Sequence, residues 1–409
     1  MIGFFIVCVL VAGFTMVAHR LAYSVVTPPM TFLFLGAVLA ISGLIDPHTA
    51  EQLLHPVAEI TLVVLLFLDA SQIDLRAFRH QHLWPSRMLL LGLPLALLFG
   101  TLAGWLLLPA WPLVGVALAA AILAPTDAAL GQAVVSNPNV PDRARRALTV
   151  ESGLNDGLAL PAVLFFASLV AASETPDATN WLAFGAAQIL LGPVAGAIVG
   201  YCGGRMLLLA KKYKTTSELY EGVGALALAG AAYLGATLIG GNGFISAFVA
   251  GLAFGAVVKG ACAFVYEFTE SEGQLLSWSA FLLLGAAIVP EAIGHLTWSS
   301  FALIMVSLFV VRPLAIWLSL TGTDASITSR LFFGWFGPRG LATALFALLV
   351  VDEITHDLAE PVLFLAVNTV WISALLHGVT AGPAARWYGA KEARMASITG
   401  SAKPLTTKE

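Results

Sequence analysis

Apolar segments long enough to cross a lipid bilayer recur from one end of the chain to the other. A helix needs about 20 residues to cross ~30 Å of hydrocarbon, and on that scale the sequence contains about 13 such segments. Charged residues make up only 11% of the chain, whereas a soluble domain has about 25%. The apolar runs are continuous and do not alternate as outer-membrane strands do, which excludes a β-barrel. We therefore predict an all-α polytopic membrane protein.

Short connections separate the predicted membrane-spanning segments, and none of them is long enough to form a soluble domain. We expect residues 1–390 to form one membrane domain and residues 391–409 to form a short cytoplasmic tail. The predicted segments lie near residues 2–18, 28–45, 54–72, 87–108, 112–136, 146–172, 181–204, 219–239, 243–258, 274–290, 298–320, 330–351 and 361–387.

Basic residues are confined to one side of this predicted topology. Only Arg312 and Arg339 fall inside predicted helices, and every other Lys or Arg lies at an alternate connection or in the tail. Basic loops stay in the cytoplasm, so we predict an inner (plasma) membrane protein with its N-terminus outside and its C-terminus inside. The net charge of −4 provides no basic face for nucleic acid.

Ionisable residues inside the predicted helices are the first candidates for function. Each costs about 2.5–3.5 kcal/mol at mid-bilayer, so each needs a reason to be there. They are Asp69, Asp127, Glu151, Asp156, Arg312 and Arg339.

Two of these charges are expected to neutralise each other. At 1.5 Å per residue, Glu151 and Arg312 reach a similar depth from the cytoplasmic side, which predicts a buried ion pair; the alternative is that Arg312 extends to the interface. Asp156 then has no basic partner, so it must hold a proton or bind a cation, as a proton/cation exchanger requires. Asp69 lies near the inner end of its helix and fits either this site or the interface.

Two predicted helices, the fifth and the twelfth, each contain a Pro beside a charged residue. They carry APTDAALG at 124–131 and FGPRGLA at 336–342. Paired interruptions at corresponding positions point to an inverted-repeat transporter. We predict repeats at about 1–172 and 219–387, joined by a linker helix at 181–204.

Unwinding these helices exposes polar helix ends inside the membrane. Asp127 is suited to offset the positive N-termini and Arg339 the negative C-termini. Carbonyl groups freed near Thr126 would be available to a cation. A pair of ordinary proline kinks is the alternative.

The motifs on five helices occur together in a familiar order. They are LDA in the third helix, PTD in the fifth, ESGLNDG in the sixth, VRP in the eleventh and GPRG in the twelfth. With these motifs the chain resembles monovalent cation:proton antiporters of the NhaP/NHE type (CPA1 family), in a short form like the bacterial ones. The resemblance extends from about residue 54 to residue 387.

The resemblance implies an ion site on three helices. Asp156 matches the carboxylate that carries the ion and the proton, and Asp69 matches the acidic residue that joins it. Ser152 and the backbone around Thr126 match further ligands of Na⁺, or of K⁺ or Li⁺. Asn155 takes the place of a second Asp found in relatives that move net charge.

The resemblance also assigns structural roles and partners. Glu151 and Arg312 match a buried salt bridge, and Asp127 and Arg339 match polar residues where the unwound helices cross. It implies a homodimer in the lipid bilayer that exchanges a monovalent cation for H⁺ and serves pH homeostasis. No cofactor is implied, and we do not expect regulation through the long cytoplasmic tail that animal members carry.

The predicted function is therefore an antiporter that exchanges Na⁺, or K⁺ or Li⁺, for H⁺ by electroneutral 1:1 competition at Asp156. A K⁺/H⁺ antiporter of the same fold and a passive cation channel are the alternatives, although channels usually line their pores with repeated rings. An intramembrane hydrolase using Ser152, Asp156 and His377 is another rival, but the chain has no G-x-S-x-G elbow.

Overall fold

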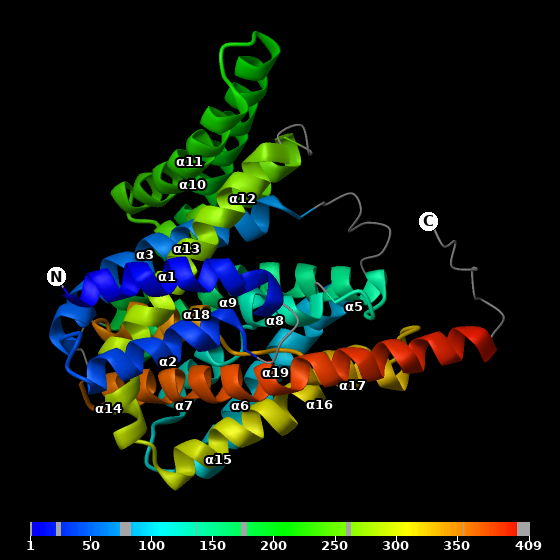
Figure 1. Ribbon diagram of the computed structural model, residues 1–409. Helices are drawn as coiled ribbons and strands as arrows, with labels where there is room; N and C mark the ends of the chain where they lie inside the picture. Colours follow the sequence, from blue (N-terminus) through cyan, green and yellow to red (C-terminus); the bar gives the residue numbers. More distant parts are fainter. Residues whose placement is uncertain are drawn as a thin grey trace.

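A computed structural model describes residues 2–21, 26–73, 83–135, 137–172, 178–258, 263–354 and 356–398. Within these ranges the chain forms helices and no strand (Figure 1). The first half contains α1 (Ile2–Leu21), α2 (Pro28–Ile41), α3 (Pro47–Ser71), α5 (Leu83–Arg87), the π-helix η1 (Met88–Gly92), α6 (Leu93–Leu107), α7 (Leu113–Ile122), α8 (Ala128–Val135) and α9 (Asp142–Ala172).

The remaining elements continue the helical pattern to the end of the described chain. They are α10 (Ala178–Lys212), α11 (Glu218–Leu238), α12 (Gly243–Val258), α13 (Ala263–Ala287), α14 (Val289–Gly294), α15 (Trp298–Val306), the π-helix η2 (Ser307–Val311), α16 (Arg312–Ser319), α17 (Ile327–Trp335), α18 (Leu341–Val351) and α19 (His356–Ile398).

Every segment predicted to span the membrane contains helix, which confirms the all-α fold class. In the described part of the chain, seven helices are long and apolar enough to cross a bilayer by length and composition, and further apolar helices are shorter. The exact number of thirteen crossings therefore stays a prediction.

The last helix differs most from its predicted bounds. α19 continues to Ile398, beyond the expected helix end at 387 and the expected domain boundary at 390. Its extension is held by other elements: the Tyr388 ring stacks on Phe332 at 4.0 Å, and Ser326 Oγ donates to Glu392 Oε1 at 2.7 Å. Residues 399–409 of the predicted tail lie outside the described chain.

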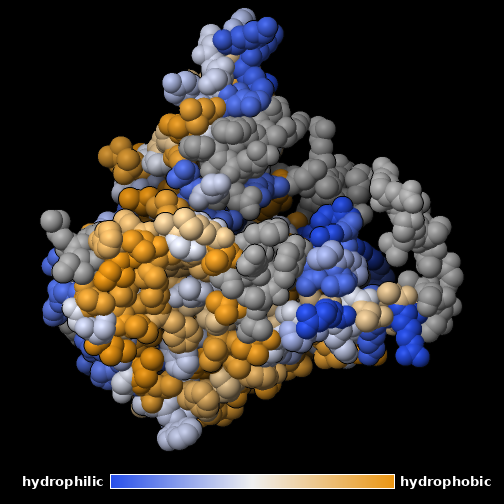
Figure 2. All heavy atoms as spheres, in the orientation of Figure 1, coloured by the Kyte–Doolittle hydropathy of each residue, from blue (hydrophilic) through white to orange (hydrophobic). Residues whose placement is uncertain are grey.

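The outer surface is largely apolar, as expected of a surface in contact with lipid. Figure 2 shows hydrophobic residues over the body and hydrophilic ones at the tip of the α10–α11 hairpin and at the end that contains α5 and α17. Val38 and Ile41 of α2 are 60% and 76% exposed, and Leu375 and Val379 of α19 are also exposed.

The predicted interruptions of the fifth and twelfth helices are confirmed. Residues 123–127 separate α7 from α8, and residues 336–340 separate α17 from α18. Each interrupted helix follows a helix that contains a π-helix, η1 in the first half and η2 in the second. The two halves thus share an order of elements, while the repeat boundaries at 172 and 219 stay predictions.

A polar network fixes one end of α9, the helix that carries the ESGLNDG motif. Arg143 donates two hydrogen bonds to the Asp324 carboxylate, at 2.5 and 3.0 Å, and Trp84 Nε1 donates a third at 2.7 Å. These bonds, chiefly those from Arg143, hold the pKa of Asp324 below its usual range. α5, α9 and the α16–α17 connection are thereby tied together.

Glycines set how closely the helices around the third span approach. α12 packs against α3 and α10, and a Cβ at Gly251 or Gly255 would collide with the carbonyl oxygens of Phe67 and Ser71. Small residues at four-residue spacing allow such close backbone packing in membranes. Because Phe67 and Ser71 flank Asp69, this contact positions the acidic residue of α3.

Gly251→Val is therefore expected to destabilise the protein by about 1–3 kcal/mol, because α3 and α12 must move apart. The matched control is Gly230→Val on α11, where a Cβ would meet no atom within 4 Å. Thermal unfolding in detergent should show a lower midpoint for Gly251→Val alone. Equal midpoints for the two variants would contradict the close contact.

Candidate functional site

The Asp127 carboxylate accepts hydrogen bonds from backbone N–H groups at the N-termini of α8 and α18, the helices that follow the two breaks. Its Oδ1 accepts the Leu130 N–H of α8 at 2.9 Å, and its Oδ2 accepts the Leu341 N–H of α18 at 2.7 Å. The Asp127 N–H in turn donates to Pro338 O at 2.8 Å, so the two breaks are joined directly. A side chain at Gly340 would collide with this carboxylate, which explains the Gly after Pro-Arg.

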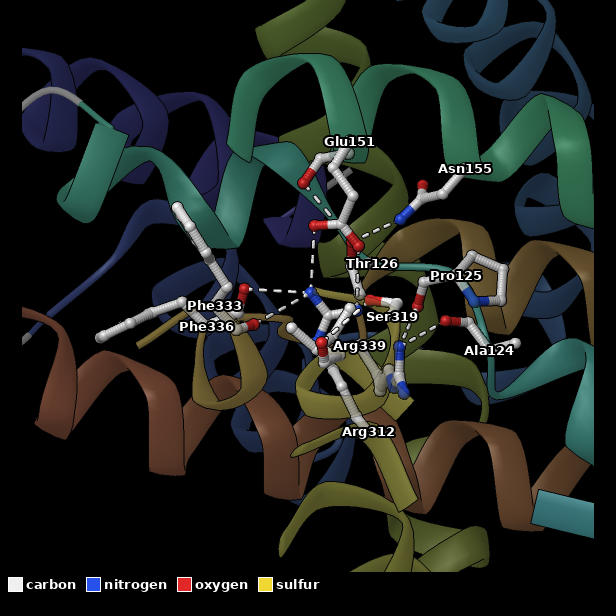
Figure 3. Close-up of polar contacts among 12 residues, drawn as sticks. Ala124, Pro125, Thr126, Glu151, Asn155, Arg312, Ser319, Phe333, Phe336 and Arg339 are labelled. Atoms are coloured by element: carbon white, nitrogen blue, oxygen red, sulfur yellow. Dashed lines mark hydrogen bonds and ion pairs between the residues drawn. The ribbon is translucent and has the colours of Figure 1, made fainter. Parts of the chain in front are cut away.

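Arg339 satisfies carbonyl groups that follow the end of α7. Its Nη1 donates to Ala124 O at 2.5 Å and to Pro125 O at 2.7 Å (Figure 3). The Arg339 backbone N–H donates to Ser373 Oγ of α19 at 2.7 Å. The side chain is 1% exposed, so this guanidinium is part of the interior.

Arg312 joins α9 to the end of α17. Its Nη1 and Nη2 donate to the two carboxylate oxygens of Glu151, each at 3.0 Å (Figure 3). Nη2 also contacts Phe333 O at 3.4 Å and Phe336 O at 3.2 Å. Gly337 lies against this guanidinium, and any side chain there would overlap it. The structure thus brings together the two side chains that the depth estimate paired.

Three polar side chains from the first break and α9 form a chain of hydrogen bonds. Asn155 Nδ2 donates to Thr126 Oγ1, and Thr126 Oγ1 lies 3.4 Å from Ser152 Oγ. Thr126 and Asn155 are 1% and 2% exposed. Thr126, Ser152 and Asn155, all predicted for the ion site, are therefore neighbours.

Asp156 lies one turn beyond Ser152 on α9 and differs from the other buried charges. Its Oδ1 is buried and has no hydrogen-bond partner among the described residues. The nearby charges that act on it are carboxylates, those of Asp127, Asp69 and Glu151. Asp69 of α3 lies against α9, where a Cβ at Gly153 would be 3.6 Å from Asp69 Cβ. The arrangement concentrates negative charge and oxygen atoms at one place.

A cavity of about 70 Å³ leads to Ser152 between α8, α9 and the second break. Its lining includes Thr149 of α9 and Pro338 of the break. Thr149 lies between Ser152 and the basic start of α9, so this cavity faces the predicted cytoplasmic side. It has room for water or a hydrated cation next to a predicted ligand.

The hydrolase triad does not assemble. His377 Nε2 lies 2.9 Å from Trp335 O, and Nδ1 lies 3.1 Å from Ser373 Oγ and 2.9 Å from Ser373 O. These contacts join α19 to α17 and, through Ser373, to the Arg339 backbone, and none of them involves Ser152 or Asp156. Within the described ranges, no group of three or more His, Cys, Asp and Glu side chains forms a metal cluster.

Several parts of the site were not predicted from the sequence. The π-helices η1 and η2 and the hydrogen bonds of Ser373 and His377 have no recognised sequence signal. Gly337 and Gly340 did have one, because glycines on both sides of a Pro-Arg pair inside an apolar helix indicate close approach of other groups.

The fold and the site together identify the class of membrane protein. Two interrupted helices cross beside a carboxylate-rich site inside a helical membrane protein, which is the architecture of secondary transporters. The family described as "Sodium/hydrogen exchanger, transmembrane" matches residues 6–387. The chain belongs to this family, which confirms the resemblance stated on the motifs.

Two relatives match more than half of the chain at low identity. The K⁺/H⁺ antiporter NhaP of Alkalimonas amylolytica is 27% identical over 380 residues, which are 91% of this chain and 64% of that protein. The chain thus spans somewhat less than two thirds of that relative. The Na⁺/H⁺ antiporter 2 of Zygosaccharomyces rouxii is 30% identical over 274 residues, 63% of this chain and 33% of that protein.

Solved structures share the fold. The sodium proton antiporter MjNhaP1 of Methanocaldococcus jannaschii at pH 8 superposes with a TM-score of 0.70 at 24% identity, covering 87% of this chain and 91% of that one. An electron-microscopy structure of MjNhaP1 gives a TM-score of 0.71 at 22% identity, with 97% and 96% coverage.

Arg312→Ala is expected to destabilise the protein by about 3–5 kcal/mol, because Glu151 is left buried without its cation. The control is Arg145→Ala, which removes the half-buried partner of the exposed Asp142 and should cost about 0–1 kcal/mol. Thermal unfolding and the yield of monodisperse protein measure both. An Arg312→Ala protein as stable as Arg145→Ala would show that the buried pair contributes little.

Proposed function

We propose that the protein is a secondary active antiporter that exchanges a monovalent cation for H⁺ at Asp156. The observation that carries this proposal is the buried Asp156 Oδ1, which has no partner among the described side chains and lies in a group of carboxylates. A carboxylate in such surroundings needs a proton or a cation to neutralise it. Family membership supports exchange of these two ligands.

The proposed ligands of the cation are Asp156, Asp69, Ser152 and the backbone at Thr126. Carboxylate, hydroxyl and carbonyl oxygens suit hard monovalent cations, and these four groups come from α3, the first break and α9. Asn155 holds Thr126 in place by its hydrogen bond. The pair Glu151–Arg312 and the charges Asp127 and Arg339 hold the framework and do not bind the ion.

Competition of one proton and one cation for the same carboxylate makes the exchange electroneutral and 1:1. Asn155 supports this stoichiometry because it contributes no second ionisable group beside Asp156. The cycle would proceed by alternating access, with the cavity beside Ser152 serving the cytoplasmic side.

Na⁺ is the proposed cation, and K⁺ is the alternative that the name of the NhaP relative supports. Li⁺ fits the same oxygen ligands. The proposed setting is a homodimer in the plasma membrane, with the N-terminus outside and the C-terminus in the cytoplasm, where exchange would serve pH homeostasis. A passive cation channel would use the same carboxylates without coupling.

Asp156→Asn is expected to abolish cation-dependent proton flux, because the amide neither binds a proton nor neutralises a cation. The matched control is Asp142→Asn at the exposed start of the same helix, which should retain flux. Proteoliposomes with a preset pH gradient receive Na⁺, K⁺ or Li⁺ in turn, and the internal pH is followed. Cation-dependent flux that persists in folded Asp156→Asn protein would refute the assignment.

Electroneutral exchange predicts that the rate does not depend on membrane potential. In the same vesicles, clamping the potential at zero or at a negative value should leave the initial rate of cation-driven proton flux unchanged. A potential-sensitive dye should show no signal when exchange begins without a clamp. A potential generated by transport would exclude 1:1 exchange, and flux without any added cation would indicate a channel.

A further inference from the structure

A second, smaller cavity lies behind the ion site, next to the Glu151–Arg312 pair. Its volume is about 10 Å³, and its walls come from η1, α6, α9, α16 and Ala124. The polar residues that line it are Glu151, Asn155 and Arg312, among apolar ones that include Ala315. A cavity of roughly 10–15 Å³ is the smallest that holds a water molecule, and it does so where two or more polar partners line it.

Two of these residues have unused hydrogen-bonding groups of opposite kind. Asn155 Oδ1 is a buried acceptor without a partner in the described part of the protein. Arg312 has five N–H donors, and its contacts with Glu151, Phe333 and Phe336 involve Nη1 and Nη2 only, which leaves a second hydrogen on Nη1 and the one on Nε. Buried polar groups in proteins nearly always find partners, often water.

We propose that this cavity binds one ordered water molecule, which accepts a hydrogen bond from the Arg312 guanidinium and donates one to Asn155 Oδ1. Arg is a donor only, so the water must offer its hydrogens to the opposite side. The orientation of the Asn155 amide agrees with this, because its Nδ2 donates to Thr126 Oγ1 and its Oδ1 is left to accept from the water.

The water makes a directed chain from the buried ion pair to the ion site. Arg312 donates to the water, the water donates to Asn155, and Asn155 Nδ2 donates to Thr126 Oγ1. The Thr126 hydrogen is then free to face Ser152 Oγ, 3.4 Å away, and Ser152 lies one turn before Asp156 on α9. Asn155 is thus a positioning residue, and Arg312 sets which way the hydroxyl groups of the site point.

Substitutions at Ala315 test this chain of hydrogen bonds without changing any residue that takes part in it. Ala315 is fully buried and lies one turn after Arg312, so a larger side chain there fills the cavity. Val and Thr have nearly the same volume, but only the Thr hydroxyl can replace the hydrogen bonds of the water. A purely structural role of the cavity predicts equal effects of Ala315→Val and Ala315→Thr.

The expected result is a cation KM about two- to tenfold higher in Ala315→Val than in Ala315→Thr, the equivalent of one lost hydrogen bond, with similar thermal stability of the two variants. This assay rests on the proposed antiport. Equal KM values for the two folded variants would overturn the proposed chain of hydrogen bonds.

A high-resolution electron-microscopy map of the unmodified protein tests the water independently of transport. The expected result is density within hydrogen-bond distance of both the Arg312 guanidinium and Asn155 Oδ1. A map that shows other buried waters but none here would overturn the proposal, even if the variants fail to fold. Failure of cation exchange itself would refute the proposed function and leave this result standing.

Discussion

The structure depends on hydrogen-bond partners for the backbone groups at four helix ends that lie inside the membrane part of the protein. Backbone N–H and C=O groups in hydrocarbon must find partners within the protein, and two interrupted helices expose both kinds. Asp127 accepts from the N-termini of α8 and α18. Arg339 donates to carbonyls after α7, and Arg312 contacts those at the end of α17. Three ionisable side chains thereby make two broken helices possible.

The same bonds separate the charges that hold the framework from the one proposed to bind the ion. Asp127, Glu151, Arg312 and Arg339 each have fixed partners, so releasing any of them would leave buried polar groups unsatisfied. Asp156 Oδ1 has no such partner among the described residues. In the proposed exchange a ligand would therefore bind to and leave Asp156 while the crossing of the helices stays intact.

The sequence predicts the breaks and their charges better than it predicts their geometry. Proline alone is not the signal, because Pro56, Pro161 and Pro193 lie inside continuous helices. At both breaks a Pro lies near a charge in an otherwise apolar segment, but this pattern is not sufficient either, because Arg312 and Pro313 are adjacent within the continuous helical span Trp298–Ser319. Single-chain patterns do not reveal that Asp127 serves both breaks, or where the π-helices lie, because those features depend on packing between distant segments.

The buried charges at the helix crossing bear on the proposed 1:1 stoichiometry of cation and proton exchange. Each helix terminus carries about half an elementary charge, so two N-termini offset Asp127, while Arg339 faces carbonyl groups of the first break. Glu151 and Arg312 neutralise each other. Asp156 then remains, with a buried Oδ1 that has no partner among the described residues, and the proposed proton or cation would supply a positive charge beside it. In the proposed exchange one proton replaces one cation, which would keep this balance constant throughout the cycle.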